Sequence, residues 1–421
     1  MTYELNKNVN LHVFPTNKYK TVRLLVRFAA PLNKETSSKR SLLASLMETN
    51  SLNFPNQTAI SKKLSDLYGA GFGIGISRNG NQHYFTVGLN IINDNLVPSG
   101  TSVLESGVEF LKEVIFSPHI IDGAFDQETF LREKENLIEY IDSIFDDKQT
   151  YAALSLQNLF FNRSSSQKTP SFGDIDSIKE ETAASLASYY QEMIATDKVD
   201  IMVIGDVAEG YVQRVFKDFG FTDRENIATP LFYQQPFQNI IHQKMEQLPV
   251  VQSKLNLAYH CDIYYYDDLY FALMIFNGLF GGFPHSKLFL NVREKHSLAY
   301  YASSSLEPFR GLVTVQTGID GKNREKVLRL INEQLRELVA GKVTNEALDQ
   351  TKVMLKNHYL LGQDNQRNLM EQAYLKLKVP AADITQEEWI ARLDAVTIQD
   401  VQEVAKHVRL QAVYFMEGEE N

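Results

Sequence analysis

The sequence predicts an α+β protein, an α/β sandwich made of two similar halves. Runs of β-branched and aromatic residues alternate with segments whose apolar residues recur at helical spacing. Segments of the first half return in the same order in the second half, as in a duplicated domain. A chain of 421 residues also exceeds the usual size of a single hydrophobic core, so we expect at least two domains.

The strands are the most regular signal. Short β-branched and aromatic runs predict strands at Thr21–Phe28, Tyr84–Asn90, Ile201–Ile204, Leu255–Tyr259, Gly311–Gly318 and Ala412–Phe415. Apolar stripes predict helices through Ile60, Leu64 and Leu67, and through Leu328, Ile331, Leu335 and Leu338. A further helix is expected over Glu346–Leu361, capped by Thr344 or Asn345 and ended by Gly362.

Three pairs of segments carry the repeat. They are Lys20–Ala30 with Val251–His260, Phe125–Leu137 with Leu348–Leu360, and the helix and strand that end at Asp206 with those that end at Glu419. The offsets are about 230, 223 and 213 to 215 residues. A slowly drifting offset is what small insertions and deletions leave in a duplicated domain.

The join between the halves lies between Asp223 and Gln247. This stretch contains Pro230 and Pro236, several Gln and Asn, and no clear periodicity, which is typical of a linker. We therefore expect domains at 1–222 and 248–421, with a linker at 223–247.

Composition excludes several classes of protein. A formal net charge of −10 argues against nucleic-acid binding, which needs a basic surface. The single cysteine, Cys261, excludes an intrachain disulfide and fits a reducing, cytoplasmic location. It is interpreted as a buried residue, with a catalytic thiol as the less favoured alternative. No apolar stretch is long enough for a membrane span and no signal peptide is recognised, so no membrane partner is expected.

Glycines alternate at Gly69, Gly71, Gly73 and Gly75. No Lys-Ser/Thr follows them, so this is not a phosphate-binding loop. A strand that something approaches closely along its backbone is the preferred interpretation.

The segment Gly278–Gly318 contains a glycine-rich turn, a helix, Arg293, Tyr300 and a strand, in that order. This order resembles the C-terminal half of the M16 zinc peptidases, the family of insulinase, pitrilysin and the mitochondrial processing peptidase. Two further segments, Thr169–Met193 and Asp197–Val207, resemble landmarks of that family's first half, so the resemblance covers nearly the whole chain. It implies two duplicated domains of the LuxS/processing-peptidase metallohydrolase fold, each an antiparallel-rich sheet packed with helices.

The resemblance also shows what is missing. The family's zinc helix carries His-x-x-Glu-His, because two histidines on one helix face can share a zinc ion while a glutamate polarises its water. Here the corresponding segment is Ser41–Phe54, and Ala44, Met47 and Glu48 stand in that region without a histidine. Glu48 is read as a solvated helix glutamate, with a remnant of the catalytic acid as the alternative.

The third zinc ligand of the family corresponds to Tyr140. Glu139 lies one residue short, which turns its side chain by about 100° around a helix. The closest two of the nine histidines are eleven residues apart, so none can form a one-turn metal clamp, although a site of scattered histidines stays open. We expect no metal or other cofactor in this chain, and zinc only in a partner subunit.

The substrate side is retained. In the family an arginine and a tyrosine at the spacing of Arg293 and Tyr300 hydrogen-bond the substrate carbonyl, and Gly281 and Gly282 resemble a short substrate-sensing loop. Seven residues would make two helical turns if the helix extended that far. The alternative pairs Arg293 with an acid such as Glu294 or Glu325 and leaves Tyr300 half-buried. The strands Gly311–Gly318 and Tyr84–Asn90 are expected to accept an extended peptide as an added strand.

The resemblance implies a catalytically inactive subunit that binds peptide and pairs with an active M16 chain carrying His-x-x-Glu-His. In the small-subunit branch two chains of this size enclose one chamber. The nearest subgroup is a bacterial one, associated with 5-aminopentanol modification of elongation factor P, in which a zinc-bearing and a zinc-less chain often occur together. The alternatives are a scaffold protein, a homodimeric peptide-binding protein without a proteolytic role, and a hydrolase with an unrecognised site.

Overall fold

The computed structural model describes residues 1–225 and 228–418. Residues 226–227 of the expected linker and Glu419, where the third repeat match ends, lie outside this range. The chain forms two compact units, each described here by itself. Unit 1 comprises Met1–Ser143, Thr169–Pro230 and Gln366–Ala373, and unit 2 comprises Ile144–Lys168, Leu231–Asn365 and Tyr374–Asn421.

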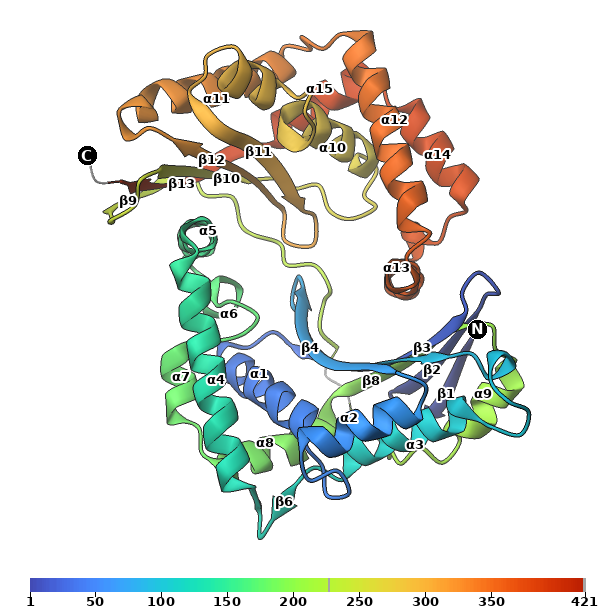
Figure 1. Ribbon diagram of the computed structural model, residues 1–421. Coiled ribbons are helices and arrows are strands. Elements are labelled where there is room, and N and C mark those ends of the chain that lie inside the picture. The colour runs from blue at the N-terminus through green and yellow to red at the C-terminus, as the bar shows by residue number, and fades with distance from the viewer. Residues whose placement is uncertain (226–227, 419–421) are drawn as a thin grey trace. The chain divides into compact units, whose positions relative to one another are not determined.

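Unit 1 is built on a six-stranded sheet (Figure 1). In spatial order its strands are β1 (Thr2–Asn6), β2 (Val9–Pro15), β8 (Lys198–Gly205), β3 (Thr21–Pro31), β5 (Gln82–Ile92) and β4 (Gly71–Asn79). Neighbouring strands are antiparallel except for the parallel pair of β2 and β8. Alternation along β3 divides the sheet into two faces, so Leu24 and Val26 point away from Arg23 and Arg27.

Helices cover one face of this sheet. They are α1 (Lys34–Thr49), α2 (Gln57–Asp66), α3 (Val103–Phe116), α4 (Gln127–Asp146, continuing into unit 2), α7 (Ile175–Glu180), α8 (Ala183–Thr196) and α9 (Glu209–Phe216), beside the small hairpin of β6 (Ile120–Ile121) and β7 (Ala124–Phe125) and the 3₁₀ turn η1 (Asp94–Leu96). Gly107 of α3 lies against Leu89 and Ile91 of β5, where an added Cβ would be 3.1 Å from Leu89. The buried core of the unit therefore lies between the sheet and these helices.

Unit 2 has a five-stranded sheet with the same strand arrangement. Its order is β11 (Ala299–Glu307), β12 (Leu312–Ile319), β10 (Ser253–His260), β13 (Arg409–Glu417) and β9 (His242–Gln247). The pair of β13 and β9 is parallel and the others are antiparallel. Each strand matches one of unit 1, with β10 in the place of β3 and β12 in the place of β5, as the repeat predicts.

Helices pack on both faces of the second sheet. They are α5 (Lys148–Phe160), α6 (Ser165–Lys168), α10 (Tyr270–Asn277), α11 (Arg324–Val339), α12 (Asn345–Gly362), α13 (Gln366–Lys378, beginning in unit 1), α14 (Gln386–Ala395) and α15 (Ile398–His407), with π-helical segments η2 (Gly278–Gly282) and η3 (Phe289–Glu294) and the 3₁₀ turns η4 (Gly321–Asn323) and η5 (Pro380–Ala382). The larger core joins Leu257 and Val315 to the side of the sheet that faces α10, α11 and α15. A smaller core joins Ala258 and Tyr414, on the opposite side, to Leu156 of α5.

The two halves of the sequence exchange a helix. Helix α5 belongs to the first half of the sequence but packs on the second sheet. The first part of α13 belongs to the second half but packs on the first sheet, where Gln366 donates from Nε2 to the carbonyl of Thr21 at 2.9 Å. The expected domains at 1–222 and 248–421 have no such exchange. A sheet has two faces that other elements can cover. In each unit the helix on the second face comes from the other half of the sequence.

Two further expectations are corrected by the sheets. Strands β5 and β12, which contain Tyr84–Asn90 and Gly311–Gly318, are internal and pair on both sides, so neither can take an added peptide strand. The edges next to them are β4 and β11. The last part of the expected linker, His242–Gln247, is strand β9. In the described residues no helix combines the length and hydropathy that crossing a membrane requires.

Candidate functional site

The zinc positions of the family lie on α1 and α4 of unit 1. Ala44 and Met47 are buried in the core of the unit, at 6% and 0% exposure, and Tyr140 is 61% exposed. Alanine, a core methionine and an exposed tyrosine do not form a zinc donor set. Across residues 1–225 and 228–418, no three His, Cys, Asp or Glu side chains come together in a way that could hold a metal ion. The residues at these positions therefore do not fit the family's metal.

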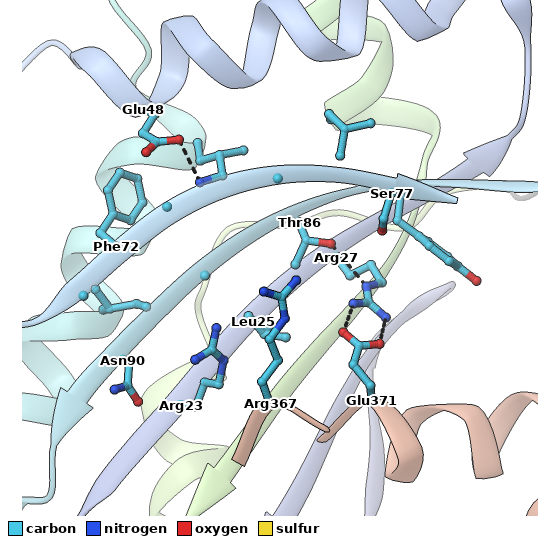
Figure 2. A pocket seen from close by; sticks show the side chains of 18 of the residues that line it. Arg23, Leu25, Arg27, Glu48, Phe72, Ser77, Thr86, Asn90, Arg367 and Glu371 are labelled. Atoms are coloured by element: carbon cyan, nitrogen blue, oxygen red, sulfur yellow. Dashed lines mark hydrogen bonds and ion pairs between the residues drawn. The ribbon is translucent and has the colours of Figure 1, made fainter. Parts of the chain in front are cut away.

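Glu48 has a structural task that the solvated interpretation missed. Its carboxylate accepts a hydrogen bond from the backbone N–H of Ile74 on the edge strand β4, at 3.1 Å (Figure 2). Burial raises the pKa of Glu48, the Ile74 hydrogen bond partly offsets this, and the negative charge of Glu133 adds to the rise. The backbone N–H of Ile74, on the edge of the first sheet, is therefore already bound by Glu48.

Replacing Glu48 by glutamine should change how stability depends on pH. A raised folded-state pKa means that the folded protein binds this proton more tightly than the unfolded chain, so the contribution of Glu48 is most favourable at low pH and declines as the pH rises from its ordinary pKa toward the raised one. Glu48→Gln keeps an oxygen for Ile74 and removes the charge. The variant should therefore lack this decline. The difference in the free energy of unfolding should stay below about 1 kcal/mol, because solvent screens a half-buried group. Urea unfolding from pH 4 to 8 measures it, and parallel curves for both proteins would contradict it.

Arg293 and Tyr300 lie on different elements of unit 2. The π-helical segment η3 ends at Glu294, Ser297 takes a left-handed backbone conformation at φ 48°, and Tyr300 lies on the edge strand β11. The condition for two helical turns between them, a helix that extends to Tyr300, is not met, because the chain turns within four residues of Arg293. The guanidinium of Arg293 lies over Phe289, 4.6 Å from the ring centroid, and its Nε is 3.6 Å from Glu294.

The exposure of this pair favours the substrate-facing interpretation for Tyr300. Its side chain is 71% exposed, rather than half-buried as in the alternative. The side chain of Arg293 is 42% exposed, and its contact with Glu294 follows the alternative pairing. A surface ion pair of this length contributes little to stability, so the arginine can exchange Glu294 for another acceptor.

Gly281 and Gly282 belong to the π-helical segment η2. A Cβ on Gly281 would lie 2.6 Å from the backbone nitrogen of Ser304 on β11, and one on Gly282 would lie 2.9 Å from the amide nitrogen of Asn277. The need for glycine at Gly281 is therefore explained by close packing against a strand. Gly282 is exposed and remains accessible.

Cys261 behaves as a buried structural residue. Its side chain is 1% exposed, and burial raises the pKa of its thiol to about 12. A thiol with so high a pKa holds almost no thiolate at neutral pH, and only the thiolate is a strong nucleophile.

A pocket of about 710 Å³ opens on the face of the first sheet opposite the helices (Figure 2). Its floor consists of side chains in register across three strands. One row is Arg23, Asn90 and Gly71, the next is Leu25, Gly88 and Gly73, and the third is Arg27, Thr86 and Gly75. Arg367 and Glu371 of the first part of α13 close one side, and all of these residues belong to unit 1.

Charge is unevenly distributed in this pocket. Arg27 forms a two-point ion pair with Glu371 and donates from Nε to Thr86 at 3.2 Å. Arg23 forms no ion pair of this kind in the described residues, although the negative charge of Glu371 also acts on it. Its Nε is buried and has no hydrogen-bond partner in the described part of the chain, and burial together with the positive charge of Arg367 lowers its pKa. In the view of Figure 2 the guanidinium of Arg367 lies beside that of Arg23, with Arg27 and its partner Glu371 on the other side of Arg367.

The alternating glycines lie on the floor of this pocket, at its outer strand. An added Cβ would meet Asn90 at 4.0 Å from Gly71, Glu48 at 3.8 Å from Gly73, and nothing within 4 Å from Gly75. None of the three has a positive φ. In the described residues neither packing nor backbone conformation requires glycine here, so the expected close approach along this strand does not come from the chain itself.

Sequence reasoning missed the arginines of the pocket. The signal was present in Arg23 and Arg27, which fall on one face of a strand that is otherwise apolar. Arg367 and Glu371 are four residues apart on one helix face. What could not be read was that this helix packs on this strand, 344 residues away.

Comparison with known proteins assigns the family. Residues 180–355 match the Peptidase M16 inactive domain. The chain is 34% identical over 412 residues to the "Probable inactive metalloprotease YmfF" of Bacillus subtilis, covering 97% of this chain and 96% of that protein. It is 23% identical to an "Uncharacterized zinc protease YmxG" of the same organism, over 73% of this chain and 74% of that protein.

These similarities place the chain in the peptidase M16 family. More particularly, it is a homologue of that family's inactive members, which confirms the noncatalytic assignment made from the missing zinc ligands.

Solved structures agree in fold. A conserved protein from Enterococcus faecalis V583 is 58% identical, with a TM-score of 0.97 over 100% of this chain and 99% of the other. A peptidase M16 inactive domain from Pseudomonas fluorescens is 18% identical, with a TM-score of 0.77 over 100% of this chain and 98% of the other. The predicted α+β fold with sheets packed against helices is confirmed.

Proposed function

We propose that this chain is the noncatalytic half of a two-chain peptidase, in which it binds peptide while a zinc-bearing M16 partner supplies the metal. The proposal includes a cytoplasmic location, for which the single buried cysteine is the support. Peptide would be the substrate, without a nucleic acid or membrane partner.

The contrast between the two candidate sites carries this proposal. At the metal positions, Ala44 and Met47 have become part of the core. On the substrate side, Tyr300 remains 71% exposed and Arg293 partly exposed. Arginine and tyrosine donors can stabilise a developing oxyanion in a site whose metal belongs to another chain.

The sheet edges support peptide binding. Tyr300 lies on β11, an edge strand of unit 2. In unit 1 β4 is an edge strand, where Glu48 already accepts from the N–H of Ile74. Edge strands present backbone donors and acceptors to which an extended peptide can add, with little dependence on its sequence. A peptide added to β11 would run past Tyr300.

Reconstitution tests the proposal through Arg293. The chain is mixed with an M16 protein from the same organism that carries His-x-x-Glu-His, and turnover of a quenched fluorescent peptide is measured beside light-scattering mass. We expect an equimolar complex that cleaves peptide and no cleavage by this chain alone. Arg293→Ala should lower kcat about 100-fold, as the loss of an oxyanion donor does, and leave the mass of the complex unchanged.

Arg329→Ala serves as a matched control, since Arg329 is an exposed arginine on α11 of the same unit. Full turnover by the complex with Arg293→Ala would contradict a substrate role and favour a scaffold. A stable homodimer that excludes the zinc-bearing chain would contradict the pairing.

A further inference from the structure

The pocket on the first sheet has a binding chemistry that the family resemblance does not supply. We propose that it binds a carboxylate of the peptide, either the C-terminal carboxylate or that of an acidic side chain, through Arg23 and Arg367. This inference rests on the proposed peptide binding and specifies which peptides are preferred.

The first support is the arrangement of the two arginines. Arg23 projects from β3 and Arg367 from the first turn of α13. Burial lowers the pKa of Arg23, and Arg367 lies close enough that its positive charge adds to this, against the opposing charge of Glu371. Two positive charges held close together repel each other. An anion bound between them replaces this repulsion by attraction to both. Arg27 does not take this part, because Glu371 already binds it at two points.

The second support is an unsatisfied donor and an unsatisfied acceptor side by side. Arg23 Nε and Asn90 Oδ1 are both buried, and within the described residues neither has a hydrogen-bond partner. They are in register on neighbouring strands. Buried polar atoms without partners are uncommon in folded proteins, and a bound ligand, ion or water can supply the missing partner.

This pair favours a peptide carboxylate over an inorganic anion. A carboxylate accepts two parallel hydrogen bonds from an arginine. An amino-acid residue also carries an N–H a few atoms from its carboxylate, and this N–H could donate to Asn90. An anion without a proton, such as sulfate, has only acceptors to offer, and would leave the Asn90 oxygen unsatisfied.

The third support is the room beside these residues. On the edge strand, Gly71 continues the row of Arg23 and Asn90. In the next two rows the edge strand contributes Gly73 and Gly75, so no side chain rises from it there. A peptide backbone lying over these glycines could approach the sheet closely. Its carboxylate would then reach the guanidiniums of Arg23 and Arg367.

Fluorescence anisotropy with four forms of one peptide tests the proposal. The probe is a fluorescein-labelled nonapeptide of Ala, Ser and Val. Two forms differ at the C-terminus, which is a free carboxylate or an amide. The other two are amides with a central Glu or a central Gln. In wild-type protein we expect at least one carboxylate form to bind about tenfold more tightly than its neutral counterpart, since charge-assisted hydrogen bonds are the stronger ones. Tighter binding of the free acid than of the amide identifies the C-terminal carboxylate as the ligand. Tighter binding of the Glu peptide than of the Gln peptide identifies a side-chain carboxylate.

Arg23→Gln and Arg367→Gln should each remove most of this preference and leave binding of the neutral peptides unchanged. Arg367 is exposed on its helix, so this variant tests the site even where Arg23→Gln perturbs folding. Arg214→Gln is the control, an exposed arginine on α9 of the same unit, and should preserve the preference.

The possible failures can be told apart. Equal affinity of wild type for carboxylate and neutral peptides overturns the carboxylate site and leaves peptide binding intact. Equal loss in Arg214→Gln and Arg23→Gln also overturns it, because bulk charge then explains the preference. Failure of all four peptides to bind overturns the proposed peptide binding, and the carboxylate site with it.

Discussion

Replacing Arg40 by alanine is expected to lower the free energy of unfolding by about 3–5 kcal/mol, the usual effect of breaking a buried ion pair. Arg40 lies in α1 and is fully buried. Its Nη1 donates to Asp197 at 2.7 Å and to Tyr189 at 3.2 Å, and its Nη2 donates to the carbonyl of Phe28 at 3.0 Å. Alanine would leave the carboxylate of Asp197 buried without its main counter-ion.

Chemical denaturation followed by circular dichroism measures this loss. Arg214→Ala removes an arginine from the surface of the same unit and should change stability by no more than about 0.5 kcal/mol. The double variant Arg40→Met, Asp197→Leu should recover much of the loss, because well-packed apolar residues can replace a buried pair. A loss below about 1 kcal/mol in Arg40→Ala would show that water reaches Asp197 and that the pair is not a structural anchor.

The sequence allowed the fold to be predicted wherever local pattern determines structure. The expected strands all lie in one of the two sheets, and the expected helix over Glu346–Leu361 is α12, with Thr344 as its cap. β-branched runs and helical spacing record burial on one side of an element, and that is a local property. The repeated order of elements also became two sheets with one strand arrangement, because duplicated segments keep their packing.

Position within a sheet could not be predicted in the same way. Tyr84–Asn90 is expected from the sequence to accept an added peptide strand, but β5 is paired on both sides. The pattern of a strand reports its two faces and not its neighbours. Where the helix that carries Arg293 ends also stays open in the sequence, because spacing alone cannot show that Ser297 adopts a left-handed conformation.

The candidate sites show the same difference between local pattern and long-range packing. The missing zinc ligands could be recognised from residue types alone, since a metal needs particular donors at particular spacing. The arginine pocket could not, because Arg23 and Arg367 come from opposite ends of the chain and meet only through the exchange of helices. Such a site depends on long-range packing, for which a single sequence gives no periodic signal.

The exchanged helix leads to the second large effect. Phe160 comes from the first half of the sequence, but it is fully buried in the smaller core of unit 2. Its ring packs edge-on against Phe161 at 4.8 Å between centroids, and its carbonyl accepts from Gln235 Nε2 at 2.9 Å. Phe160→Ala should lower the free energy of unfolding by about 3–5 kcal/mol, because it removes a core ring and leaves a cavity.

The location of that loss distinguishes the exchanged arrangement from two contiguous domains. Hydrogen exchange of Phe160→Ala should accelerate in β10 and β13, on which α5 packs, and not in β3 and β5. Phe110→Ala is the matched control, since Phe110 is buried in α3 of unit 1, and it should give the opposite pattern. Faster exchange in β3 and β5 with Phe160→Ala would mean that α5 stabilises the half of the sequence to which it belongs, as a contiguous domain requires. Faster exchange in β10 and β13 would mean that each sheet depends for its second face on a helix from the other half, so neither half of the sequence would fold alone to its full stability.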